Sequence, residues 1–174
     1  MHGHPLAFMR IPFDVLAAID SRWLHYALQP VHYLIRIVHL LSMAAFFGGI
    51  GLLDFRLMGW RGSILLRPFA KGVLPWLYVT FGVTAATGLL LFLYDPVAVG
   101  SHAFFVPKMI FVALGLLNAA IYHQTGYVAA LASERSMPVS ARVAGAVSLA
   151  LWTGVIVCAA LDVESVPKVY LQLY

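Results

Sequence analysis

Residues 36–59 read RIVHLLSMAAFFGGIGLLDFRLMG, and this stretch decides the fold class. A bilayer is crossed by about 20 mostly apolar residues in a helix. Arg36 and His39 lie near the start of the run, three glycines lie in its middle, and Asp54 and Arg56 lie at its end. The stretch therefore predicts a transmembrane helix that carries an imidazole about two turns from one end.

The composition of the whole chain points in the same direction. Its 174 residues are 62% hydrophobic and 10% charged, with a mean hydropathy of +0.89. Soluble domains average roughly 45–50% apolar and about 25% charged residues. The net charge of +4 comes from short basic loops, so no nucleic-acid partner is expected. The one cysteine, Cys158, forms no intrachain disulfide, and the N-terminus lacks the pattern of a cleaved signal peptide.

Four segments are long enough to span a bilayer, at roughly 31–53, 73–94, 104–122 and 142–161. In lipid each span satisfies its backbone hydrogen bonds internally, which requires helices. The sequence therefore predicts an all-α fold, an integral membrane four-helix bundle over residues 31–161.

Residues 1–30 show helical spacing of polar and apolar positions from Pro12 onward. This predicts an N-terminal interfacial amphipathic helix with Trp23 and Tyr26 at headgroup level. Residues 162–174 are too short to span and form a tail.

The loops set the expected orientation. The predicted connections 54–72 and 123–141 are basic, whereas the turn 95–102 has no lysine or arginine. The positive-inside rule places the basic loops in the cytoplasm. Both termini, including the 162–174 tail, are then extracytoplasmic in a multi-pass protein.

Candidate site residues gather in the outer half of this predicted bundle. His32, Arg36, His39 and Met43 form one stripe on the first span, and Lys108 lies about four residues into the third. Ionisable groups inside a span cost roughly 2.5–3.5 kcal/mol at its centre and indicate function.

This set suits a haem. An imidazole is a common axial ligand of haem iron, so His39 is the expected metal ligand. Arg36 and Lys108 would pair with the propionates. The second axial position would be taken by Lys108, by Met43 or Met109, or by nothing. The expected cofactor-binding set is His39, Arg36, Lys108, Met43, Gly48, Gly49 and Gly88, with the glycines opening room for a flat macrocycle.

Each of these features also has a plainer explanation. Glycines in membrane helices mark close helix packing, and Arg36 and Lys108 can extend to the headgroups. His39 can hydrogen-bond across helices with no ligand. Asp54 and Arg56 can pair as helix-end charges. Copper is the rival metal, although the methionines and Cys158 lack a Met-x-x-Met or Cys-x-x-Cys spacing.

Three stretches carry a resemblance: HLLSMAAFFGGIGLLDFRLMG, GVTAATGLLLFLYDP and PKMIFVALGLLNAAIYH. They resemble a group of four-helix bacterial inner-membrane proteins and, more distantly, the HemJ type of protoporphyrinogen oxidase and the copper-resistance D (CopD) family. The matching positions are His39, the run 46–49, Arg56, the run 87–89, Lys108 and Tyr122-His123. The resemblance implies haem b bound through His39, with Lys108 essential nearby, in a bacterial inner membrane.

Four functions follow as hypotheses. The leading one is a haem-b-binding protein that serves electron transfer. The others are a protoporphyrinogen-oxidase-like membrane oxidoreductase, an accessory structural subunit of a larger membrane complex, and a copper-handling protein. The expected partners are the lipid bilayer, a quinone or other redox partner, and membrane-complex subunits or further copies of the chain.

Overall fold

The computed structural model describes residues 10–60, 65–127, 130 and 137–163. Within these ranges the regular elements are helices: α1 (Phe13–Ile19), α2 (Arg22–Leu28), α3 (His32–Leu57), α4 (Leu66–Tyr94), α5 (Pro96–Gly100), α6 (Phe105–Thr125) and α8 (Val139–Val163). Helices α3, α4, α6 and α8 are long and apolar enough to cross a membrane, as a multi-pass membrane protein in contact with lipid requires. The predicted all-α membrane bundle is confirmed.

Helix α4 begins at Leu66, well before the predicted boundary at 73. Its first turns have one face in the core, because Leu66 is 2% exposed and Ala70 is fully buried. Arg67 and Lys71 lie on the exposed side of the same turns. The basic residues expected in a loop therefore belong to a helix that packs through its apolar face.

The N-terminal segment is helical as expected, but it is divided into two short helices. The backbone of Asp20 is extended, and the Ser21 hydroxyl accepts a hydrogen bond from the Leu24 amide at 3.4 Å, which caps a new helix. Leu16 of α1 is fully buried and fills the space beside Gly100 of α5. Trp23, 78% exposed, remains at the surface.

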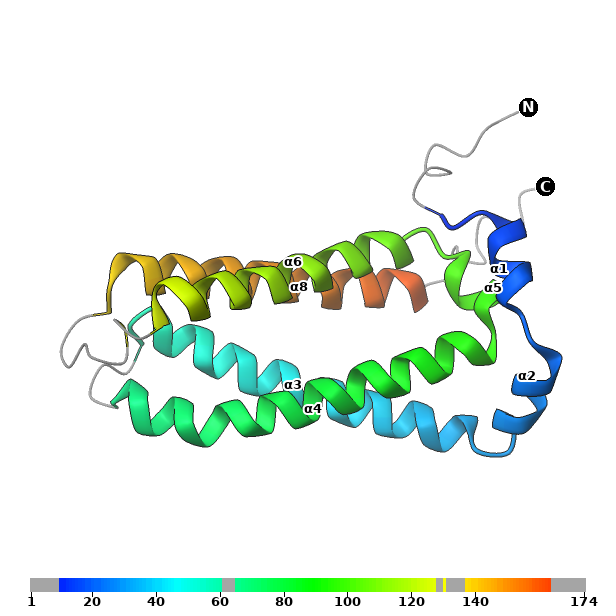
Figure 1. The fold of residues 1–174 in the computed structure, drawn as a ribbon, viewed down its shortest axis with the longest axis horizontal. Helices are drawn as coiled ribbons and strands as arrows, with labels where there is room; N and C mark the ends of the chain where they lie inside the picture. Colours follow the sequence, from blue (N-terminus) through cyan, green and yellow to red (C-terminus); the bar gives the residue numbers. More distant parts are fainter. Residues whose placement is uncertain (1–9, 61–64, 128–129, 131–136, 164–174) are drawn as a thin grey trace, which may run out of the picture.

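The four long helices form two antiparallel pairs. Helix α3 packs along α4, α6 packs along α8, and the pairs meet through α3 and α8 (Figure 1). Among the described residues, the backbones of α4 and α6 have few close approaches, and the Phe92 and Phe105 rings stack between them at the His39 end, 5.4 Å apart. We call the end where α3 and α6 begin the His39 end, and the end where they finish the Asp54 end. Helices α1, α2 and α5 lie at the His39 end, on the right of Figure 1.

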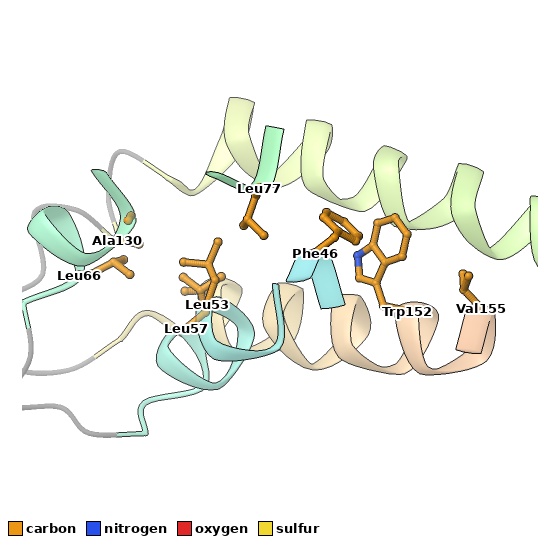
Figure 2. Close-up of a cluster of buried hydrophobic side chains, with 10 residues drawn as sticks. Phe46, Leu53, Leu57, Leu66, Leu77, Ala130, Trp152 and Val155 are labelled. Atoms are coloured by element: carbon orange, nitrogen blue, oxygen red, sulfur yellow. The ribbon is translucent and has the colours of Figure 1, made fainter. Parts of the chain in front are cut away.

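An aromatic cluster forms the centre of the bundle. The rings of Phe46 on α3 and Trp152 on α8 lie 4.8 Å apart between centroids, edge to face, and Phe81 of α4 lies 5.3 Å from Phe46. Figure 2 shows the two rings of Phe46 and Trp152 facing each other. A Cβ at Gly115 of α6 would lie 3.1 Å from the Trp152 indole, so a larger residue there would have to move the ring or the helix by a few tenths of an ångström.

Candidate functional site

His39 lies on the face of α3 that packs against α4. Its Nδ1 atom is 3.1 Å from the Thr84 carbonyl oxygen and 3.0 Å from Thr87 Oγ1. The Thr87 hydroxyl is committed as a donor to the Val83 carbonyl at 2.6 Å, so it accepts from the imidazole. Two acceptors facing Nδ1 place the imidazole proton on that nitrogen.

The other ring nitrogen of His39, Nε2, is consequently a lone-pair donor. Within the described part of the chain, Nε2 has no hydrogen-bond partner. Histidines that bind metals usually have this arrangement, in which one ring N–H is held by a carbonyl and the opposite nitrogen faces the ion. Thr84 and Thr87 were not among the predicted site residues, although they lie one turn apart on α4.

The predicted glycines have three different surroundings. At Gly88, a Cβ would lie 3.0 Å from His39 Cε1, so this glycine makes room for the imidazole itself. At Gly49, a Cβ would lie 2.8 Å from a terminal carbon of Leu77. At Gly48 no atom would lie within 4 Å of a Cβ, and this residue is exposed on α3. Protein side chains thus occupy the space beside Gly88 and Gly49.

Lys108 lies at the His39 end, as predicted, and it is ion-paired. Its Nζ atom is 3.1 Å from Asp162 Oδ2 and 5.0 Å from the centre of the Phe105 ring. Asp162 also accepts a hydrogen bond from the Phe104 amide at 3.1 Å, at the start of α6. His102 Nδ1 lies 4.0 Å from the same carboxylate.

Asp162 is therefore the organising residue of this cluster, and the sequence reasoning did not include it. The predicted fourth span ended at 161, which assigned Asp162 to the tail. In the structure α8 continues to Val163, so the carboxylate lies on the last turns of α8 beside the first turn of α6. Because the third and fourth spans are antiparallel, Lys108 near the start of the third span and Asp162 at the end of the fourth lie at the same depth.

Arg36 and Met43 lie on either side of His39 along α3. Arg36 is exposed and makes no hydrogen bond or ion pair with another described residue. Met43 is half-buried, one turn beyond His39. The structure thus brings His39 and Met43 to one face, with Arg36 open for a further partner.

Two further histidines stack on one tyrosine at the His39 end. His25 of α2 and His32 of α3 lie 4.4 Å and 4.7 Å from the Tyr94 ring, nearly parallel to it. His25 Nδ1 also lies 2.8 Å from the Tyr94 carbonyl oxygen. The stack fixes α2 on the end of α4. Among residues 10–60, 65–127, 130 and 137–163, no group of three metal-ligating His, Cys, Asp or Glu side chains converges.

The Asp54 end contains a partly open cavity of about 470 Å³. It lies between α4 and α6, with α3 and α8 as its floor. Its walls are mostly apolar and aromatic, including Phe46, Leu53, Leu77, Phe81, Leu116 and Trp152. Its polar lining comes from Asp54, Tyr78, Asn118, Tyr122, His123, Gln124, Tyr127 and Ser148.

Asp54 is the most deeply buried charged residue among those described, at 2% exposure. Its carboxylate receives a hydrogen bond from Ser148, while Oδ2 has no partner among the residues that the structure describes. The Tyr122 hydroxyl, on the α6 side of the same cavity, is also buried without a partner. A Cβ at Gly145 of α8 would lie 2.9 Å from the Asp54 carbonyl oxygen, so α8 approaches α3 closely here.

The pairing of Asp54 and Arg56 as helix-end charges stays a prediction, and the structure shows that both side chains are buried. Arg56 is also buried, at 4% exposure. Tyr127, which follows α6 and lines the cavity, has a pKa raised by burial and by the nearby Tyr78. Its hydroxyl therefore remains protonated and can donate at neutral pH.

Comparison with known proteins assigns no relative: no family model matches the sequence, and neither a curated protein nor a solved structure is significantly similar to it.

Proposed function

We propose that this chain is a haem-b-binding membrane protein that serves electron transfer, with His39 as an axial ligand. The observation that carries the proposal is the pair of hydrogen-bond acceptors that face Nδ1 of His39. The Thr84 carbonyl and Thr87 hydroxyl hold the Nδ1 proton, which leaves Nε2 as a neutral nitrogen ligand. Such a held imidazole is a stronger ligand than a freely rotating one.

The charges around His39 support an anionic cofactor. Arg36 precedes His39 by three residues on α3 and engages no other described side chain. Residues three apart on a helix are neighbours on its surface, so Arg36 would pair with a propionate. Lys108 forms an ion pair with Asp162. We therefore expect the Lys108 ammonium group to lie near the cofactor without binding the cofactor directly.

Haem iron supplies a reversible one-electron couple when it is bound. The chain supplies the ligand, and the hydrogen bonds behind His39 tune its basicity. Met43 would pack beside the ligand from the next turn of α3. A quinone in the bilayer is the proposed electron-transfer partner, since it would reach the bundle laterally.

The proposal is tested by the absorption spectrum of the purified full-length protein, oxidised and reduced, after reconstitution with hemin. We expect a Soret band that sharpens and shifts on reduction, as b-type haem shows. His39→Ala should abolish it. His123→Ala is the matched control, because His123 lies at the Asp54 end of the bundle. A wild-type protein without a Soret band, or His39→Ala with an unchanged spectrum, contradicts the proposal.

We further propose that the Asp54 end faces the cytoplasm of a bacterial cell. Basic residues gather at that end, with Arg67 and Lys71 on the first turns of α4 and Arg142 on the first turns of α8, all exposed. The positive-inside rule favours this orientation. Single cysteines at Arg142 and at Ser101 in a Cys158→Ala background test it with a membrane-impermeant thiol reagent. Labelling of intact cells at position 142 but not 101 would reverse the assignment.

A further inference from the structure

The cavity at the Asp54 end has properties that the haem proposal does not use. It is partly open, and it is lined on two sides by α4 and α6, whose backbones have few close approaches. The outer surfaces of both helices carry exposed apolar side chains such as Val79, Leu117 and Ile121. A molecule entering this opening would therefore come from the lipid and not from water.

The cavity walls fit a flat ring. Phe46, Phe81 and Trp152 contribute aromatic surfaces from three different helices. Aromatic rings favour offset-stacked or edge-to-face neighbours. The volume of about 470 Å³ falls within the roughly 300–1,000 Å³ of typical small-molecule sites.

The polar side chains that line the cavity determine which substituents a bound ring would need. Asp54 Oδ2 is buried and has no partner among the described residues, and a carboxyl oxygen accepts hydrogen bonds. The Tyr122 hydroxyl is buried and unpartnered on the facing wall. A buried polar group without a partner costs about 1–3 kcal/mol, so a ligand that satisfies both groups would recover that cost. Hydroxyl donors on the ring satisfy Asp54, and their oxygens can accept from Tyr122.

We infer that the α4–α6 cavity binds a quinol, a dihydroxylated aromatic ring on an apolar tail, with Asp54 accepting a hydrogen bond from a ring hydroxyl. This binding is independent of haem, although it gives the proposed electron-transfer partner a site. Phe46, which borders the cavity, follows His39 by seven residues on α3. That spacing is about 10 Å along the helix.

The test is calorimetric titration of the purified full-length chain with decylubiquinol under anaerobic conditions. A matched ligand, the dimethyl ether of the same quinol, keeps the ring and tail but has no hydroxyl donors. We expect the wild-type protein to bind the quinol about 10- to 100-fold more tightly than the ether, because the ether leaves the buried Asp54 oxygen without a donor. Asp54→Leu, which has no acceptor at this position, should reduce that ratio to near one.

A second variant is needed because a substitution of buried Asp54 can also destabilise the fold. Ala119 of α6 lines the cavity and is otherwise exposed, so Ala119→Trp should fill the space and abolish binding without disturbing the core. Ala113→Trp is the matched control, because Ala113 is exposed on α6 outside the cavity. We expect it to bind as the wild-type protein does.

Three results would overturn the inference: no binding to the wild-type protein, equal binding of quinol and ether, or unchanged binding by Ala119→Trp. A co-purified phospholipid that the quinol does not displace would equally overturn it. His39→Ala separates this inference from the haem proposal. It should lose the Soret band and keep the quinol affinity, so either proposal can fail alone.

Discussion

His39 and Asp54 lie at opposite ends of the bundle, and their surroundings differ in opposite ways. His39 is half-buried, its Nδ1 is held by two acceptors, and its Nε2 is left open. Asp54 is almost fully buried, and one carboxylate oxygen faces a cavity without a partner. A metal ligand needs a fixed ring with one open nitrogen, whereas a hydrogen-bonding site needs an unsatisfied acceptor beside an empty space. This difference is the basis for proposing a different ligand at each end.

Trp152 separates these two ends, and its removal should have the largest effect. The indole packs against Phe46 and Phe81 and supports Gly115 of α6. Trp152→Ala should lower the free energy of unfolding by about 3–5 kcal/mol, as large-to-small core changes do. Unfolding in mixed detergent micelles measures the loss. Trp76→Ala is the control, since Trp76 is 57% exposed. Equal losses for the two variants would mean that the aromatic cluster is not the core.

The Lys108–Asp162 pair should come next and should affect the His39 end alone. Asp162 holds both the lysine and the Phe104 amide. Asp162→Asn should destabilise by about 1.5–3 kcal/mol, the range for hydrogen bonds to charged groups. Circular dichroism during thermal unfolding measures this loss of stability. Asp14→Asn on exposed α1 is the control. A change in quinol affinity in Asp162→Asn would show that the two ends are coupled.

Gly145 tests the close approach at the Asp54 end. A Cβ there would press on the Asp54 carbonyl oxygen at 2.9 Å, and overpacking of this kind costs about 1–3 kcal/mol. Gly145→Ala should therefore destabilise and weaken quinol binding. Gly48→Ala, with no atom within 4 Å, should be neutral or slightly stabilising, because alanine favours the helix. The same sign for both variants would contradict the assignment of a tight α3–α8 contact.

The smallest effect is expected from Thr87→Val. This change removes one of the two acceptors behind His39 and keeps the Thr84 carbonyl. The haem affinity should fall about 10-fold, the lower end for groups that orient a metal ligand. Hemin titration measures the fall. Thr153→Val, on an exposed position of α8, should leave the affinity unchanged. Enhanced binding in Thr87→Val would show that the Nδ1 hydrogen bonds oppose ligation.

Much of the architecture could be predicted from the sequence, because spanning helices are determined by apolar length. The number of spans and their antiparallel order follow from that property alone. The start of α4 could not be predicted from the sequence. The charges of Arg67 and Lys71 indicated a loop, whereas Leu66 and Ala70 form a buried face on the same turns. The charges marked a loop in the sequence, yet they lie on the outside of a helix.

The candidate site was predictable only in part. The shared depth of His39 and Lys108 follows from their positions near the start of the first and third spans, which run in the same direction. The partner of Lys108 was missed, since Asp162 lay one residue beyond the predicted span. The cavity beside Asp54 could not be predicted, because it depends on which helices fail to pack together. Residues of α4 and α6 line it jointly, and no pattern within either helix sequence predicts that the two helices border the same cavity.

The packing of α3 on α8 affects how the two helical hairpins can move relative to each other. The hairpin of α3 and α4 and the hairpin of α6 and α8 pack together mainly through α3 and α8. At the His39 end they are also connected by α5 and by the stacked Phe92 and Phe105 rings. A small separation of α4 from α6 would therefore be easiest at the Asp54 end, where neither connection is present. Shear or rotation of packed helices occurs on microsecond to millisecond timescales, so ligand exchange at the Asp54 end would require no change at the His39 end.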